Sequence, residues 1–398
     1  MSNSFVYRKP QDALFEYAKT IKTPAVIYEL NQLNDTIDAI QQDIALFKQA
    51  KLNFALKACH NMSVLQLMAQ KNLGCDVASV NECKIAVEAG FSEITTTAPA
   101  YEEEDMWFFH ENNIIMDLDS TEQIEQYGKL FPGTEIGIRV HVEMPNAYNN
   151  DASFGNNSRF GMNVTDERIR TVSQKYDLKI VRLHVHTGQM TDASLEYKIK
   201  YLLTVAEFYS DVRAIDLGGG FFYLYNDRQT FQDALIKASD YVAEWEKTTG
   251  RSIHFIFEPG GAIVTPCGYL VTKVMSVKES SYYKHRIITV NASAWNLAPW
   301  HNAVAVKVNK EDGEETEPTI IAGNTLYELD FFGNRSDKPF NLFELGKLNA
   351  NDRLIISMFG GYTFTNARHF NALDWPEEYA LLNGELKECQ NGGKNGKL

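Results

Sequence analysis

The stretch Asn53-Phe54-Ala55-Leu56-Lys57-Ala58-Cys59-His60-Asn61 begins as an apolar strand and ends in a lysine followed by a polar turn. An apolar environment disfavours the ammonium form of a lysine, so it lowers the pKa and exposes a nucleophilic amine. A strand that delivers Lys57 in this way can hold an aldehyde cofactor as a Schiff base. On this stretch alone, a strand that ends in a surface lysine is the simpler interpretation, and the rest of the chain decides between the two.

From this stretch onward, strand-like runs alternate with helical patterns. Apolar residues follow helical spacing over Met62–Lys71, Val80–Ala89 and Thr121–Leu130, among other segments. The strand-like runs end near Lys57, Ser79, Thr97, Leu118, His141, Thr187, Gly219 and Glu258. Strands that alternate with helices in this manner predict an α/β protein built on a parallel (β/α)8 barrel.

After Glu258 the pattern changes to short β-rich runs, such as Tyr269–Val277 and Arg353–Met358, without long helices between them. This change predicts a second, all-β domain at the C-terminal side. The expected domains are an N-terminal segment over 1–30 whose strand joins the β domain, a barrel over 31–262, a β-rich domain over 263–389 and a disordered tail over 390–398.

Composition narrows the functional classes. The chain has 398 residues and a net charge of −14, which argues against binding to nucleic acid or to anionic membranes. Its five cysteines are odd in number and irregularly spaced, as expected for free thiols in a reducing compartment, and they form no metal-site pattern. The N-terminus lacks an apolar run, and no apolar stretch is long enough to span a membrane. We therefore expect a cytoplasmic protein without a metal.

Catalytic groups of a β/α barrel lie at the C-terminal ends of its strands. The predicted ends carry these candidates: Lys57, Asp76, Arg139, His184, His186, Gly218, Gly219, Gly220 and Glu258. Three glycines after a strand let backbone N–H groups approach an anion, although a tight turn explains them equally well. Glu258 is a carboxylate in an apolar run and needs a cationic partner, either a protonated ring nitrogen or a barrel Arg or Lys. His186 fits stacking on an aromatic ring or a place in the core.

The joint pattern favours the functional interpretation. The motifs occur in the order Phe-Ala-Leu-Lys57-Ala, Cys-Asp76-Val-Ala-Ser-Val-Asn-Glu82, Ser158-Arg159-Phe160-Gly161, His184-Val-His186-Thr-Gly188, Leu217-Gly-Gly-Gly-Phe221 and Glu258-Pro-Gly260. Their order and spacing resemble the pyridoxal-phosphate-dependent decarboxylases with an alanine-racemase-like barrel, which act on ornithine, diaminopimelate or carboxynorspermidine. The resemblance runs from about Pro24 to Pro376.

The resemblance implies pyridoxal 5'-phosphate as the cofactor and a role for each matching residue. Lys57 would hold the cofactor covalently, Glu258 would pair with the ring nitrogen, and His186 would stack on the ring. The other cofactor-binding residues implied are Gly218, Gly219 and Gly220 around the phosphate, Tyr362 hydrogen-bonded to it, and Asp76 and Arg139 near the ring edge. The resemblance also implies a head-to-tail homodimer with shared active sites.

The loop Gly323–Asp330 departs from the family pattern. Leu326 stands where the family carries a cysteine that is thought to protonate the carbanion after loss of carbon dioxide. A leucine has no proton to give, so Tyr327, Glu328 or a water would substitute as the donor. Tyr327 and Asp330 are the expected substrate-binding residues of this loop. Gly261 replaces the family's arginine after Glu-Pro-Gly, which makes diaminopimelate a less favoured substrate, and Gln189 replaces a serine.

Several motifs, including Thr97-Ala-Pro-Ala-Tyr101 and Asn291-Ala-Ser-Ala294, are more similar to the carboxynorspermidine branch than to ornithine decarboxylase. The expected activity is removal of a carboxylate from an amino acid or an amino-acid conjugate. The substrate would be a polyamine precursor such as carboxynorspermidine, or a siderophore precursor such as a citryl-diamino acid. Two alternatives stay open: a racemase or other lyase that uses pyridoxal phosphate on the same scaffold, and a non-catalytic homologue.

Overall fold

A computed structural model describes residues 8–148, 155–301, 303–309, 313–333 and 338–389 of the chain. The chain divides into two compact units. The first unit contains Ile37–Lys57 and Met68–Ala262, and the second contains Ala58–Leu67 with the described segments before Ile37 and after Ala262. The tail expected to be disordered, 390–398, lies outside the described residues.

The first unit is a closed barrel of eight parallel strands that follow one another in chain order. The strands are β2 (Ala50–Ala55), β3 (Gly74–Val77), β4 (Ile94–Thr97), β5 (Met116–Leu118), β6 (Glu135–Arg139), β7 (Lys179–His184), β8 (Ala214–Asp216) and β9 (His254–Phe257). The barrel closes where β2 pairs with β9, with Leu52 opposite Phe257. Most strand residues are buried, as parallel strands covered on both faces require. The (β/α)8 barrel predicted from the sequence is therefore confirmed.

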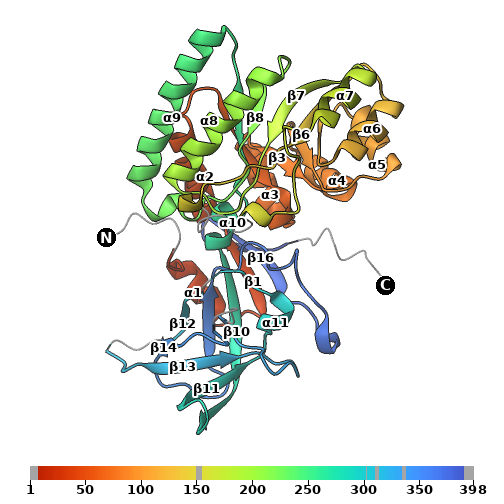
Figure 1. The fold of residues 1–398 in the computed structure, drawn as a ribbon. Helices are drawn as coiled ribbons and strands as arrows, with labels where there is room; N and C mark the ends of the chain where they lie inside the picture. The colour runs from red at the N-terminus through yellow and green to blue at the C-terminus, as the bar shows by residue number, and fades with distance from the viewer. Residues whose placement is uncertain (1–7, 149–154, 302, 310–312, 334–337, 390–398) are drawn as a thin grey trace. The chain divides into compact units, whose positions relative to one another are not determined.

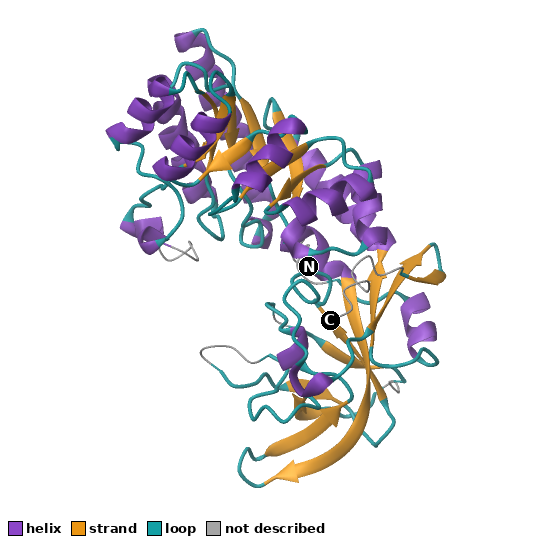
Figure 2. Cartoon of the chain, turned by 90° about the vertical axis from the view of Figure 1, so that its right-hand side faces the viewer, coloured by secondary structure: helices purple, strands orange, loops and turns teal. Residues whose placement is uncertain are grey.

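Helices connect the barrel strands and flank them (Figures 1 and 2). They are α2 (Leu30–Ile44), α3 (Met62–Gln70), α4 (Val80–Ala89), α5 (Glu103–Glu111), α6 (Thr121–Leu130), α7 (Glu167–Lys175), α8 (Asp192–Phe208) and α9 (Arg228–Thr249). Helix α4 shows how the sequence sets such bounds. The Ser79 hydroxyl accepts a hydrogen bond from the backbone N–H of Glu82 and caps the first turn. Gly90 ends the helix with φ +96°, a left-handed conformation that glycine adopts without a Cβ penalty.

The second unit is built on a nine-stranded sheet, so the predicted all-β C-terminal domain is confirmed. Its main path runs β14 (Phe343–Leu345), β13 (Glu317–Ala322), β11 (His285–Val290), β10 (Gly268–Ser280), β1 (Ala25–Glu29), β16 (Glu377–Leu382) and β17 (Glu385–Glu388). Two further strands, β12 (Ala305–Lys307) and β15 (Arg353–Ser357), pair with each other, and β15 also pairs with β10. Strand β1 pairs antiparallel with β10 and parallel with β16, so an N-terminal strand lies inside this sheet.

Short helices complete the second unit: α1 (Asp12–Ala18), α10 (Gly261–Val264) and α11 (Ala294–Leu297). Helix α1 packs Leu14 and Ala18 into a buried cluster with Ile27, Tyr269 and Ile355 of the sheet. All five cysteines are buried free thiols. In the part of the chain that the structure describes, no helix is both long and apolar enough to cross a bilayer.

Candidate active site

Lys57 and Asp76 meet at the ends of two neighbouring barrel strands. Lys57 lies on a 3-10 turn, Leu56–Ala58, directly after β2, and Asp76 lies within β3. The Lys57 Nζ atom is 3.8 Å from Asp76 Oδ2, and the lysine side chain is 49% exposed. The sequence argument placed this amine in a mostly apolar environment, and that expectation is wrong. Lys57 is instead an accessible amine whose neighbour is a buried carboxyl group.

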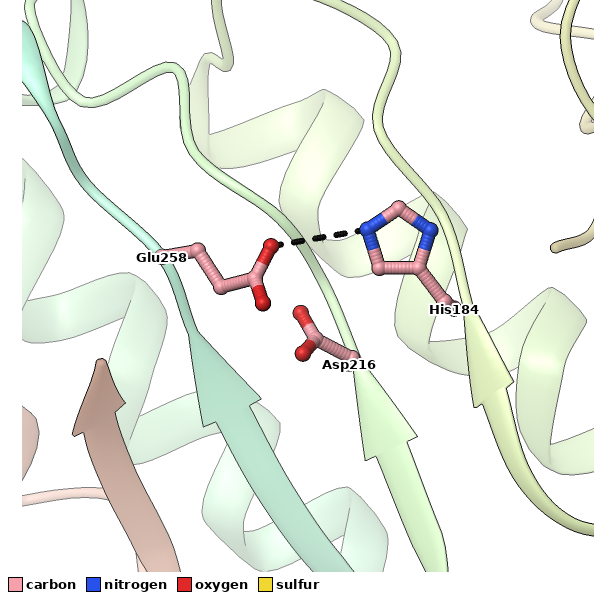
Figure 3. A group of neighbouring side chains, drawn as sticks. All are labelled: His184, Asp216 and Glu258. Carbon is pink, nitrogen blue, oxygen red and sulfur yellow. Dashed lines mark ion pairs between the residues drawn. The ribbon is translucent and has the colours of Figure 1, made fainter. Parts of the chain in front are cut away.

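A buried cluster forms at three strand ends: His184 and Asp216 are the last residues of β7 and β8, and Glu258 directly follows β9 (Figure 3). The His184 Nε2 atom is 3.4 Å from Glu258 Oε2. The carboxyl group of Asp216 lies beside that of Glu258 (Figure 3), and atoms of the three residues lie within 4.8 Å of one another. Thr95 on β4 donates a hydrogen bond of 3.4 Å to Glu258 Oε1. The Glu258 carboxylate is therefore contacted by two side chains, His184 on β7 and Thr95 on β4.

The protonation states of this cluster differ because its members differ in their partners. Burial alone would raise the pKa of Glu258, but the hydrogen bond and charge of His184 lower it to about 2. Burial, and then the charge of Glu258, raise the pKa of Asp216 well above its ordinary value. Burial and Glu258 act in the same direction on the pKa of Asp76, against the charge of Lys57. The arrangement thus favours the anionic form at Glu258 over the anionic forms of Asp216 and Asp76.

His186 and the glycine turn Gly218–Gly220 follow strands β7 and β8 and approach each other closely. Burial, and then the charge of Lys57, lower the pKa of His186 well below its ordinary value, so its ring is neutral. Gly218 has φ +67° and Gly220 φ +98°. A Cβ on Gly218 would lie 2.6 Å from Val185 O and 2.9 Å from His186 Cβ, and one on Gly219 would lie 2.7 Å from Glu258 O. Only glycine fits at these positions, and a turn without Cβ atoms lets backbone N–H groups approach a phosphate.

Arg139, at the end of β6, is buried and lies 3.8 Å from Asp119 through its Nε atom. Its guanidinium group stacks on the ring of Phe160, 4.2 Å from the ring centre. Burial lowers the pKa of Arg139, and the charge of Asp119 opposes this shift. Arg139 is therefore a fixed cation at the same end of the barrel as Lys57.

The remaining predicted site residues belong to the second unit. The loop Gly323–Asp330 presents Leu326 with 88% of its surface exposed, while Glu328 beside it is also exposed. The Tyr327 ring packs on Trp295 with ring centres 4.0 Å apart. Asp330 is buried, and its carboxylate accepts hydrogen bonds from Trp295 N, Thr325 N and Thr325 Oγ1. These bonds fix the loop, so Asp330 acts first as a positioning residue for Tyr327.

An aromatic pocket of ≈570 Å³ opens beside this loop in the second unit. Its lining residues are Ala294, Trp295, Ala298, Pro299, Trp300, Tyr327, Leu329, Phe331, Gly333 and Arg368. Arg368 stacks on Trp295 at 4.2 Å and donates a hydrogen bond of 2.6 Å to the Trp295 carbonyl. Trp300 stacks on Tyr362 with ring centres 4.2 Å apart and an interplanar angle of 8°. Among the described residues, the lining combines flat apolar surfaces with one cation, Arg368.

The sequence analysis listed His184 as a strand-end candidate without a role, and it did not single out Asp216, Thr95 or Lys198. Asp216 is the last residue of its strand, so the rule that strand ends carry function would have found it. Lys198 sits in the middle of helix α8 and carries no sequence signal beyond its own type.

A parallel barrel that places an amine, an anionic carboxylate and a glycine turn at its strand ends has the parts to hold a phosphorylated aldehyde cofactor. The fold and the site therefore define a protein that binds a phosphorylated aldehyde cofactor. Residues 30–265 match the family model described as "Pyridoxal-dependent decarboxylase, pyridoxal binding domain". The chain belongs to that family, and its cofactor is pyridoxal phosphate. It is a carboxy-lyase that acts on an amino acid.

Curated relatives and solved structures agree with this assignment. The chain is 26% identical to diaminopimelate decarboxylase of Escherichia coli K12, over 87% of this chain and 88% of the relative. It is 25% identical to diaminopimelate decarboxylase of Buchnera aphidicola from Schizaphis graminum, over 96% and 94% of the two chains. Diaminopimelate decarboxylase of Helicobacter pylori in complex with L-lysine has the same fold, with a TM-score of 0.78 at 20% identity over 94% of this chain and 95% of that one. The arginine decarboxylase of Paramecium bursaria Chlorella virus gives a TM-score of 0.77 at 19% identity, over 92% and 98%. None of these four proteins bears the name of the carboxynorspermidine or siderophore branch.

Proposed function

We propose that the strand-end residues of the barrel hold pyridoxal phosphate and carry the decarboxylation. The residues present fit the group: the glycine turn has backbone N–H groups and no Cβ atoms, and Lys57 offers an accessible amine. Lys57 would bind the aldehyde, Gly218, Gly219 and Gly220 the phosphate together with Tyr362, and His186 the ring face. Asp76 and Arg139 would lie near the ring edge. When bound, the cofactor supplies an electron sink for the carbon that loses carbon dioxide.

The observation that carries this proposal is the buried pair of Glu258 and His184. The Glu258 pKa of about 2 makes this residue an anion at every physiological pH, because His184 stabilises the charge. A buried anion at this place is suited to keep a ring nitrogen protonated, which strengthens the electron sink. The same group of ligand types, one imidazole and two carboxylates, would also suit a divalent metal. The family's organic cofactor gives Glu258 a partner without a metal, so we assign the anion to the ring nitrogen.

We propose that the substrate is an amino acid or an amino-acid conjugate whose distal end carries a carboxylate. The support is the aromatic pocket beside Tyr327, in which Arg368 is the charged lining residue. A guanidinium binds a carboxylate through paired hydrogen bonds and repels an ammonium. The two Trp side chains offer flat surfaces along which an extended substrate can lie.

The positive charge of Arg368 distinguishes between the candidate substrates. Diaminopimelate, the substrate in the relatives' name, has a distal carboxylate, and so does a citryl-diamino acid. Carboxynorspermidine ends in amines, which Arg368 disfavours. The pocket therefore favours a siderophore precursor of the citryl type or diaminopimelate over the polyamine precursor, although Gly261 in place of the family arginine weighs against diaminopimelate.

The test is carbon dioxide release by the purified enzyme loaded with pyridoxal phosphate. Four substrates are compared at matched concentrations: a citryl-diamino acid, meso-diaminopimelate, carboxynorspermidine and L-ornithine. We expect turnover to be highest with a substrate that carries a distal carboxylate. Highest turnover with carboxynorspermidine or ornithine would reject the assignment of the distal group. Racemisation without carbon dioxide release would point to the racemase alternative, and absence of a cofactor absorbance band to a non-catalytic homologue.

We also propose that two copies form a head-to-tail homodimer and share their active sites. Leu326 supports this, because an apolar side chain 88% exposed at a loop tip gains stability when a second chain covers it. Sedimentation of the purified protein tests the proposal: a dimer that dissociates when Leu326 is changed to Asp agrees with it, and a wild-type monomer contradicts it.

A further inference from the structure

Lys198 is a charged residue in a place where charges are costly. It lies in the middle of α8 with 0% of its surface exposed. In the described part of the chain it makes no ion pair; its Nζ atom donates to Leu217 O at 3.3 Å and lies 2.7 Å from the Met190 sulfur. Burial lowers the pKa of Lys198 to about 7, against the charge of Asp216. A buried amine with such weak compensation lowers stability, so a role in function accounts for its presence better than packing does.

The partner of Lys198 is the first peptide group of the glycine turn. The Leu217 carbonyl accepts from Lys198, and the Gly218 N–H of the same peptide donates to Asp216 Oδ1 at 2.9 Å. The next carbonyl, Gly218 O, accepts from Glu258 N at 2.9 Å. At the far end of the turn, Gly220 O accepts from Met190 N at 2.8 Å. The turn is thus tied down on its carbonyl side, which leaves its later N–H groups to face a ligand.

We propose that Lys198 is a positioning residue for the cofactor's phosphate: it fixes the Leu217–Gly218 peptide plane together with Asp216, and a bound phosphate favours its protonated form behind the anion-binding turn. A cation in a low-dielectric region acts on a nearby anion over a longer distance than it would in water. The ligand class is a phosphate monoester, and the inference depends on the cofactor and not on the choice of substrate.

The test compares pyridoxal phosphate with pyridoxal, which lacks the phosphate. Both are aldehydes that Lys57 can bind, so the ratio of their dissociation constants isolates the phosphate. The apoenzyme is titrated with each compound and followed by absorbance, for the wild type, Lys198→Met and Lys198→Gln. Lys200→Met serves as the matched control, because Lys200 lies on the same helix but pairs with Glu196 at the surface.

We expect Lys198→Met to weaken pyridoxal phosphate binding about 10- to 100-fold, the loss expected for a hydrogen bond that involves a charged group. Pyridoxal affinity should change less than about 3-fold, and Lys200→Met should bind both compounds as the wild type does. Lys198→Gln, which keeps a donor but no charge, should fall between the two. The holoenzyme of Lys198→Met should also lose its cofactor faster after dilution.

Two results would overturn the proposal. Equal weakening of both compounds in Lys198→Met would show that the lysine supports the fold in general and has no relation to the phosphate. Wild-type affinity of Lys198→Gln for pyridoxal phosphate would show that the charge has no role. If Lys198→Met fails to fold, the affinities of Lys198→Gln for pyridoxal phosphate and for pyridoxal still decide the question.

Discussion

The strand ends of the barrel and the aromatic pocket of the second unit differ in how deeply their residues are buried and in whether strands or loops carry them. At the barrel, His184, Asp216 and Glu258 are at most 3% exposed and come from three adjacent strands. In the pocket, Tyr327, Trp300 and Arg368 come from loops and keep contact with solvent. Strands hold buried charges at fixed separations, whereas loops tolerate changes in sequence and length.

This difference places the proposed reaction at the barrel and the proposed recognition of the substrate at the pocket. The protonation states at the barrel depend on several residues at once: His184 lowers the pKa of Glu258, and Glu258 raises that of Asp216. A change to one of them alters the others, so such a site resists variation. Within the described part of the pocket, one cation, Arg368, stacks on Trp295, and a substitution of Arg368 removes none of the contacts within the barrel cluster. Each of the following variants changes a residue of either the barrel or the second unit.

The largest effect is expected from Lys57→Ala. Alanine has no amine to bind the aldehyde, so we expect loss of both the cofactor absorbance band and turnover. Lys51→Ala is the control, because Lys51 lies on the same strand but pairs with Glu93 at the surface. Turnover in Lys57→Ala with the band retained would contradict the role of this lysine.

Glu258→Gln is expected to lower kcat by about 10² to 10³-fold, the typical cost of removing one preorganised electrostatic contact. The amide keeps the size of the side chain but not its charge, so the cofactor should stay bound while the ring nitrogen loses its proton. Absorbance and kcat are measured in parallel, with Glu93→Gln as a surface control. A near-normal kcat would remove Glu258 from the mechanism.

Much of the barrel followed from the sequence because its signals are local. The strand ends expected near Thr97 and Leu118 are those of β4 and β5, and Lys57 lies two residues beyond the end of β2. Periodicity reports burial on each element, and the barrel rule then places the strand ends together. The residues Asp76, Arg139, His186, Gly218–Gly220 and Glu258 were located in this way.

What the sequence did not predict depends on contacts between distant segments. The exposure of Lys57 is set by the turn Leu56–Ala58 and not by the apolar strand before it. The partnership of Lys198 with Leu217 joins α8 to the residue after β8, and no spacing rule connects them. The sequence predicted Asp330 as a substrate-binding residue, but it did not predict the three hydrogen bonds that the Asp330 carboxylate accepts from Trp295 and Thr325 in the folded loop.

The loop of the second unit offers the next test. General acid catalysis contributes about 10² to 10⁴ in rate, so a proton donor that replaces the family cysteine should be measurable. Tyr327→Phe keeps the ring on Trp295 and removes only the hydroxyl, while Glu328→Gln keeps size and removes the acid. We expect one of them to slow turnover and to alter the stereochemistry of deuterium incorporation, and Leu326→Cys to change little. Unchanged rates and stereochemistry in both would leave an ordered water as the donor.

Arg368→Met tests the pocket. We expect KM for a substrate with a distal carboxylate to rise about 10-fold, as when a charged hydrogen bond is lost, with kcat nearly unchanged. Arg368 also holds the Trp295 carbonyl, so Arg368→Lys is included because it keeps the charge. A rise in KM for ornithine of the same size would show that the variant has damaged the pocket in general.

The smallest effect concerns stability and compares the buried lysine with the exposed arginine. The pKa of Lys198 falls from 10.5 to about 7 on folding, because burial opposes its charge. Between these pH values the unfolded chain binds a proton that the folded chain does not. The contribution of Lys198 to the free energy of unfolding therefore increases as pH rises from about 7 to 10.5. The slope approaches about 1.4 kcal/mol per pH unit. Lys198→Met removes this pH dependence.

Urea unfolding of the apoenzymes is measured at pH 7, 8 and 9. The free energy of unfolding of the wild type should increase relative to that of Lys198→Met as pH rises, while Arg368→Met follows the wild type. Parallel curves for wild type and Lys198→Met would mean that Lys198 keeps an ordinary pKa, and that the barrel tolerates its charge as easily as the pocket tolerates that of Arg368.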